Sequence, residues 1–217
     1  VYHTGYENYS AFLNAAKPYI GEPETLLVTG FSAGGFATSL LADDVIDHFP
    51  SAKNITVCVD SSLLLYKDWH KTATELWKAP EEISKRLTGE NLVLDSLTAL
   101  HKKRGDQVKI LFDCSYRDDT LQEYQAFIRA GKMEKSKANG NRFQKDLGEM
   151  VSALKKKIPE IGIFVWSYNK DKETGNTQHT IISSKAVFEP LEDDTSVADW
   201  IKEAVDGNVE THGLHLL

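Results

Sequence analysis

The stretch that decides the fold is Leu26-Leu27-Val28-Thr29-Gly30-Phe31-Ser32-Ala33-Gly34-Gly35. It begins as an apolar run typical of a buried parallel strand. Residues 30–34 then fit the pattern G-x-S-x-G, and a helical pattern follows over residues 35–48. A strand, this pattern and a helix in succession indicate a nucleophile elbow, a tight turn that exposes the serine above the sheet.

The chemistry of such a turn depends on small neighbours and on a free backbone N–H. We expect Gly30 and Gly34, with Ala33 between serine and helix, to leave room for a strained backbone at Ser32. The Ala33 N–H would lie at the helix N-terminus, where it can stabilise an oxyanion. The other interpretations are an ordinary packing turn or a phosphate loop, although the pattern G-x-x-x-x-G-K-[ST] is missing.

The composition excludes several classes of protein. The 217 residues are 41% hydrophobic and 26% charged, which is typical of one soluble globular domain. The net charge of −7 argues against general nucleic-acid binding. No apolar run is long enough to predict a membrane span. Cys58 and Cys114 lie in strand-like runs and are predicted to be buried free thiols.

Strands and helices alternate along the chain. The strands are predicted at residues 25–31, 55–60, 108–113 and 161–168. The helices are predicted at residues 6–20, 35–48, 74–87, 91–104, 118–130, 142–158 and 196–205. This alternation predicts an α/β fold with a parallel, doubly wound sheet.

Residues 63–105 are too long for a simple crossover and are interpreted as a helical cap insert within a single domain spanning residues 1–217. The insert contains Tyr66, Trp69 and Trp77. These aromatic side chains are candidates for a sugar-stacking wall or an acyl pocket. The other interpretation is that they form the core of the cap helices.

Candidate partners for Ser32 follow later strands, because the carboxyl ends of parallel strands meet at one edge of the sheet. An α/β-hydrolase needs Ser, then an acid, then His, in that order along the chain. His179 follows the fourth strand and is the candidate base. The candidate acids are Asp113, Asp118 and Asp119 after the third strand and, less favoured, Asp60 after the second.

Six other histidines are less well placed for this role: His3, His48, His70, His101, His212 and His215. The spacing of His212 and His215 fits a metal pair, but a third ligand is missing nearby. We therefore predict no metal site.

Several of these motifs resemble the pectin acetylesterase and Notum family of serine esterases. The resemblance rests on residues 30–35, Gly5-Tyr6-Glu7-Asn8, Asp60-Ser61-Ser62, Asp119-Thr120-Leu121-Gln122, Gln178-His179-Thr180-Ile181 and the tail at residues 213–217. It implies that Ser32 is the nucleophile, His179 the base and Asp119 the acid, the last through the D-x-x-Q pattern. It also implies ester hydrolysis without metal or cofactor.

The sequence departs from the family in two ways. The family begins with a strand and a Gly-Gly-Gly-Trp type loop that completes the oxyanion hole, and nothing like it occurs here. We therefore expect the sequence to lack the first strands of the domain. Eukaryotic members are rich in disulfides, so the two cysteines favour a bacterial relative, either secreted or cytoplasmic.

The leading hypothesis is a serine esterase that removes an acyl group, favouring acetyl, from a small ester or a carbohydrate. Two alternatives remain. One is a lipid-ester or thioester hydrolase with the same triad. The other is a non-catalytic carbohydrate-binding or scaffold protein that retains the hydrolase fold.

Overall fold

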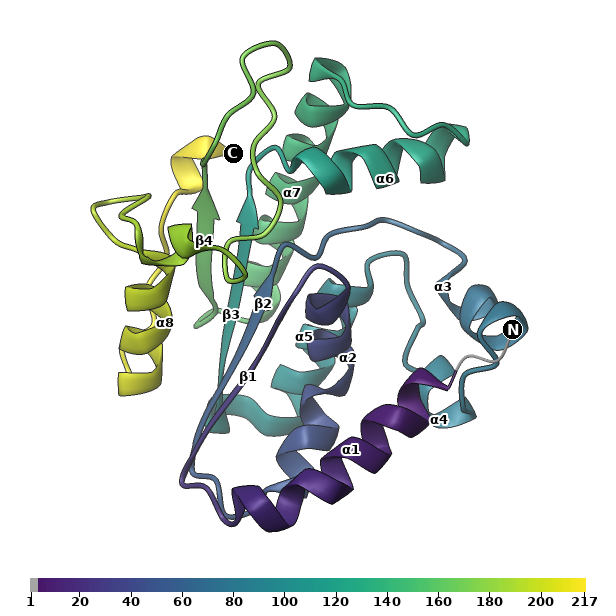
Figure 1. Cartoon of the computed structure of the whole chain (residues 1–217), viewed down its shortest axis with the longest axis vertical. Coiled ribbons are helices and arrows are strands. Elements are labelled where there is room, and N and C mark those ends of the chain that lie inside the picture. Colours follow the sequence, from purple (N-terminus) through teal and green to yellow (C-terminus); the bar gives the residue numbers. More distant parts are fainter. Residues whose placement is uncertain (1–3) are drawn as a thin grey trace.

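A four-stranded parallel sheet forms the centre of the computed structural model, which describes residues 4–217 (Figure 1). The strands are β1 (Thr25–Phe31), β2 (Asn54–Asp60), β3 (Val108–Ser115) and β4 (Gly162–Trp166), and they lie side by side in chain order. The four predicted strands are confirmed, with small shifts at their ends. Phe31 is in register with Asp60, and Asp60 with Asp113, so the chain leaves these strands at one common edge.

Helices cover both faces of the sheet. On one face lie α2 (Ala33–His48), α5 (Leu92–Arg104) and α7 (Lys137–Lys157). Two helices pack on this layer, α1 (Gly5–Ile20) against α2 and α6 (Asp119–Ala130) against α7. On the other face lies α8 (Val197–Asp206). The predicted α/β class with a parallel sheet is therefore confirmed.

The strands divide their side chains between two apolar cores. Because successive residues of a strand point to opposite faces, Ile110 and Phe112 of β3 pack under α5 and α7, whereas Leu111 packs toward α8. Cys58 and Cys114 are buried, free thiols, as predicted. The inner strands are thus apolar on both faces, as a parallel sheet requires.

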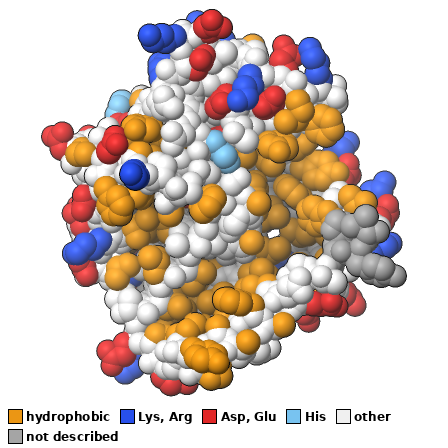
Figure 2. All heavy atoms as spheres, viewed as in Figure 1, with side chains coloured by type: hydrophobic (Ala, Val, Ile, Leu, Met, Phe, Trp, Pro, Cys, Tyr) orange, Lys and Arg blue, Asp and Glu red, His pale blue; other side chains and the backbone are white. Residues whose placement is uncertain are grey.

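The edge strand β1 is covered on one face only. Leu26 and Val28 pack against the core beneath α2. On the opposite face, Leu27 is 43% exposed and Phe31 is 44% exposed. Figure 2 shows further hydrophobic side chains on the visible face of the molecule, over α1 at the bottom and α6 at the upper right. The exposed hydrophobic residues of α1 include Phe12, Tyr19 and Ile20. The expectation that the sequence lacks the first strands of the domain remains a prediction.

The segment between β2 and β3 differs from its prediction. The helix predicted over residues 74–87 is wrong: the chain forms α3 (Trp69–Lys71), a π-helical turn η1 (Thr72–Leu76) and, after a break, α4 (Glu81–Ser84). The break contains Lys78 at φ 54° and Pro80, whose ring disfavours a helical residue before it. The helical cap predicted over residues 63–105 remains a prediction, and its last helix, α5, packs against α2 and α7.

Polar side chains fix the starts of several helices. Asn91 caps α5, and Ser196 caps α8 through the Asp199 N–H. Ser136 accepts the Asn139 N–H, so α7 begins five residues before its predicted start at residue 142. Three short 3₁₀ turns complete the fold: η2 (Gly105–Gln107), η3 (Lys185–Phe188) and η4 (Leu214–Leu216). None of the helices described for residues 4–217 combines the length and the apolar character needed to span a membrane.

Candidate active site

Ser32 occupies a strained turn between β1 and α2. Its backbone has φ 53° and ψ −126°, a conformation that residues other than glycine rarely adopt. Such strain costs on the order of 1–3 kcal/mol and persists only where surrounding contacts enforce it. Here the Ser32 N–H donates to the Asp60 carbonyl at 3.0 Å, and the Ser32 carbonyl accepts the Gly35 N–H at 2.9 Å.

Two glycines make this turn possible. A Cβ on Gly30 would lie 2.5 Å from the Gly34 carbonyl oxygen, and a Cβ on Gly35 would lie 2.1 Å from Ser62 Oγ. Gly34 was expected to be needed for the same reason, but the space around it is open. The crowded positions are therefore Gly30 and Gly35.

The Ala33 N–H is placed as the sequence predicted. Ala33 is the first residue of α2, so its N–H has no partner inside the helix. Within residues 4–217, no hydrogen bond from this N–H to another group is found. A free donor at a helix N-terminus favours negative charge beside Ser32.

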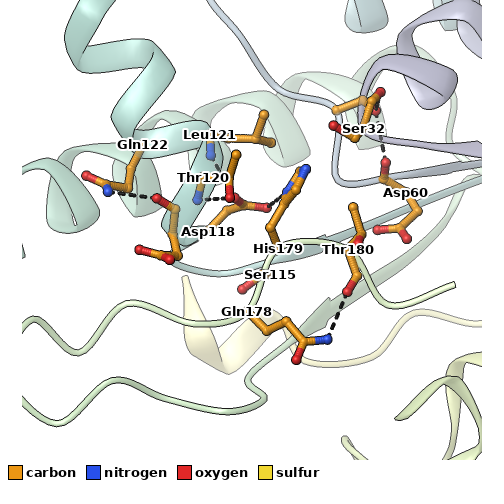
Figure 3. A network of polar contacts seen from close by, with 12 residues as sticks. Ser32, Asp60, Ser115, Asp118, Thr120, Leu121, Gln122, Gln178, His179 and Thr180 are labelled. Atoms are coloured by element: carbon orange, nitrogen blue, oxygen red, sulfur yellow. Dashed lines mark hydrogen bonds and ion pairs between the residues drawn. The ribbon is translucent and has the colours of Figure 1, made fainter. Parts of the chain in front are cut away.

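His179 lies in the loop after β4 and contacts Asp118. Its Nδ1 is 2.7 Å from Asp118 Oδ2 (Figure 3), and Asp118 is completely buried. When the imidazole is neutral, Nδ1–H donates to this carboxylate and Nε2 keeps a lone pair. Nε2 is buried and has no hydrogen-bond partner among the described residues, so it is available to accept a proton.

The structure places Asp118, and not the predicted Asp119, beside the imidazole. Asp119 is the first residue of α6, and its carboxylate pairs with Lys135 at 2.6 Å. Asp118 has two tasks: while Oδ2 contacts His179, Oδ1 accepts the N–H groups of Thr120 and Leu121 and caps α6. The family resemblance predicts Asp119 through the D-x-x-Q pattern, and such a pattern does not show which of two adjacent side chains points toward the histidine.

The environment shifts the pKa values of both partners. Burial lowers the pKa of His179, but the hydrogen bond with Asp118 and the nearby charges of Asp118, Asp60 and Asp119 outweigh it, so the pKa is raised above its ordinary value. Burial raises the pKa of Asp118, and its hydrogen bonds to His179, Leu121 and Thr120 offset part of that rise. The imidazolium is thus stabilised by its partner.

The predicted aromatic residues come together around Trp69. The Trp69 ring lies 5.3 Å from Tyr66, 6.3 Å from Trp77 and 6.0 Å from Phe36, measured between centroids. Phe36 stands in the first turns of α2, four residues after Ser32. Trp69 packs partly against the main core, whereas Trp77 is 36% exposed. A role in binding substrate remains a prediction for all three predicted residues.

The other candidate residues have contacts of their own. Asp113 is fully buried and accepts the Trp166 Nε1–H at 3.2 Å. His212 and His215 face Asp193, Glu210 and Glu192. His48 contacts Asn14, His70 contacts the Ser84 carbonyl, and His3 lies outside the described residues. Across residues 4–217, no group of three or more His, Cys, Asp or Glu side chains is arranged to hold a metal ion.

The fold and this edge of the sheet define an α/β protein with a Ser, His and Asp set at the carboxyl ends of parallel strands. The solved structures to which the chain is similar include two crystal forms of the Wnt deacylase Notum from Drosophila. They match with TM-scores of 0.54 and 0.57 and 15% sequence identity, over 94% and 92% of this chain. The chain spans 64% and 61% of those chains, so it corresponds to less than two thirds of their length. No protein-family model and no curated protein matches the sequence.

Proposed function

We propose that this protein is a serine hydrolase that cleaves an acyl ester, with Ser32 as nucleophile, His179 as base and Asp118 as the acid that orients it. The observation that carries the proposal is the hydrogen bond between buried Asp118 and His179 at the same sheet edge as the strained Ser32 turn. A strained nucleophile, an imidazole with a free Nε2 and a buried carboxylate are the parts of this chemistry.

In the proposed mechanism, Ser32 Oγ attacks the ester carbonyl while His179 Nε2 takes the hydroxyl proton. Asp118 stabilises the resulting imidazolium, and the Ala33 N–H donates to the oxyanion. The imidazolium then protonates the departing alcohol, which leaves an acyl group on Ser32. Water, deprotonated by His179, releases that acyl group as an acid.

For the substrate, we propose an acetyl ester on a carbohydrate. The aromatic cluster of Tyr66, Trp69 and Trp77 supports this choice, because flat sugar faces stack on such rings. The Wnt deacylase Notum, which shares the fold, is named for removing an acyl group, and the same proposed triad is suited to other acyl chains.

A non-catalytic binding protein is the second candidate. It is favoured by one observation: His179 Nε2 makes no hydrogen bond, to Ser32 Oγ or to any other described group. This candidate predicts an inert Ser32.

One experiment separates the two. The purified chain is treated with a fluorophosphonate probe and assayed with 4-nitrophenyl acetate, followed by peptide mass analysis. Labelling of Ser32, with hydrolysis that falls roughly 10⁶-fold in Ser32→Ala, is expected. Ser152→Ala, an exposed serine on α7, is the matched control and should retain both. An unlabelled Ser32 in folded protein would favour the binding protein.

A further inference from the structure

Asp60 connects the two segments that carry Ser32 and His179. Its side chain is fully buried at the end of β2, and Oδ2 accepts the N–H groups of Ile181 at 2.9 Å and Ile182 at 3.0 Å. Its main-chain carbonyl accepts the Ser32 N–H at 3.0 Å, as Figure 3 shows. A single residue therefore contacts both sides of the candidate site.

Ser62 strengthens the connection on the Ser32 side. Its hydroxyl lies 2.9 Å from the Asp60 carbonyl oxygen and 2.8 Å from the Ser32 carbonyl oxygen. The first contact stays at the end of β2, and the second joins the segment after β2 to the turn after β1. Contacts with the end of β2 therefore fix the position of Ser32, and Asp60 is the last residue of that strand.

The loop that carries His179 needs such an anchor. Between β4 and η3 the chain has no regular helix or strand, and Thr180, directly after His179, has φ 61°. On one side of His179, Gln178 N–H donates to the Tyr168 carbonyl at 3.0 Å. On the other side, the main-chain N–H groups of Ile181 and Ile182 both end on Asp60.

We propose that Asp60 is a positioning residue that sets the place of His179 relative to Ser32 by holding residues 181–182 with its carboxylate and residue 32 with its carbonyl. The proposal rests on the catalytic roles proposed above. Asp60 itself does not touch the reacting atoms.

The charge of Asp60 also affects the pKa values of neighbouring groups, so its role can be tested by titration as well as by structure. Four titratable groups interact with it: Asp113 and Cys114 on β3, Cys58 on β2, and His179 on the loop. Burial, and then the charge of Asp60, raises the pKa of Asp113 well above its ordinary value. The negative charge of Asp60 also helps to raise the pKa of His179.

Three variants test the proposal. Asp60→Ala removes the acceptor from the Ile181 and Ile182 N–H groups, whereas Asp60→Asn keeps an acceptor oxygen but removes the charge. Asp113→Asn is the matched control, because it changes a buried carboxyl group that interacts with Asp60 and leaves the Asp60 carboxylate in place. Each variant is measured by kcat and KM, by the His179 ring titration in NMR spectra, and by amide exchange at Ile181 and Ile182.

In Asp60→Ala we expect kcat to fall by on the order of 10²-fold with little change in KM, because a shift of about 1 Å in a catalytic group has that effect. Amide exchange at residues 181–182 should accelerate. In Asp60→Asn, which covers the case in which Asp60→Ala does not fold, the His179 titration should move to lower pH. Asp113→Asn should leave that titration and kcat near wild type.

Unchanged amide exchange and His179 titration in both folded Asp60 variants would overturn the proposal. An equal effect in Asp113→Asn would also overturn the proposal, because it would show that the loss of kcat comes from disturbed core packing and not from Asp60. The NMR measurements need no catalysis, so they remain decisive if Ser32 is not labelled by the fluorophosphonate and the proposed function itself fails.

Discussion

Asp118 uses its two carboxylate oxygens for different partners, and that division organises the candidate site at the residue scale. Oδ1 accepts two N–H groups at the start of α6, and Oδ2 faces His179. The helix N-terminus therefore fixes the carboxylate, and the carboxylate fixes the imidazole. The residue that caps α6 therefore also orients the imidazole that we propose as the base.

Asp118→Asn should lower kcat by roughly 10⁴-fold, because its amide group would favour the tautomer whose Nε2 carries the proton. Asp119→Asn is the control. It removes a half-exposed ion pair with Lys135, a contact that contributes about 0–1 kcal/mol to stability, and should leave kcat unchanged. Steady-state kinetics on both variants decides, and the reverse order of effects would restore Asp119 as the acid.

The pH dependence of kcat/KM follows from His179. The proposed base must be neutral at Nε2, and its pKa lies above the ordinary value of 6.5. As pH falls through that raised pKa, protonation removes the base and the rate declines. We therefore expect the acid limb of kcat/KM above pH 6.5, as measured in buffers of constant ionic strength. A limb at or below 6.5 would contradict the stabilising effect of Asp118.

Much of this site could be predicted from the order of residues along the chain. Ser32 and His179 are predicted to lie at one edge of the sheet because each follows a predicted strand, and the ends of parallel strands share an edge. The choice between Asp118 and Asp119 could not be made, because two adjacent acids at a helix start fit the same pattern and only their side-chain directions differ. The link from Asp60 to Ile181 joins residues 121 apart, and no local pattern signals it.

At the scale of the element, the turn from β1 into α2 depends on backbone approach. Gly35→Ala would drive a Cβ into Ser62 Oγ and within 2.8 Å of the Asp60 carbonyl oxygen. We expect a loss of about 1–3 kcal/mol in unfolding free energy, as for other overpacked sites. Urea unfolding monitored by circular dichroism measures it.

Gly34→Ala is the control for this prediction. It lies in the same turn but has open space around its Cβ direction, and it should cost nothing in stability. Equal losses in both variants would show that helix α2 is sensitive to any added methyl group rather than to the contact with β2.

The elements themselves were predictable where burial and periodicity agree. The apolar runs of the four strands predict their positions closely, and the helix predicted over residues 91–104 corresponds to α5 with its cap at Asn91. Prediction failed between residues 74 and 87, because a helical apolar spacing continued across Ala79-Pro80, where the proline ring and Lys78 at positive φ interrupt the backbone. The sequence prediction also omitted the first turn of α7, because the polar residues after Ser136 include lysines and asparagines and show little helical apolar spacing.

At the scale of the whole molecule, stability should depend on pH through Asp113. Because its folded pKa is raised well above the ordinary 3.8, the native state binds a proton more tightly than the unfolded chain. This contribution is fully present below the unfolded pKa and is lost as pH rises toward the folded pKa.

Asp113→Asn removes that titration. The unfolding free energy of the variant relative to wild type should therefore increase as pH rises above 3.8, the ordinary pKa of this carboxyl. Urea unfolding at several pH values measures it. A constant difference across this range would show that Asp113 is ionised in the native state.

The half-covered strand β1 has a consequence for how any activity would respond to heat. Edge elements with exposed apolar groups open locally at a lower free energy than the core. Within residues 4–217, β1 pairs with β2 alone and exposes Leu27 and Phe31. Fraying of β1 would release the Ser32 turn from the Asp60 carbonyl while β2, β3 and β4 stay folded. Heat inactivation would then precede the cooperative melting transition, and the interval between the two would measure the opening of one strand.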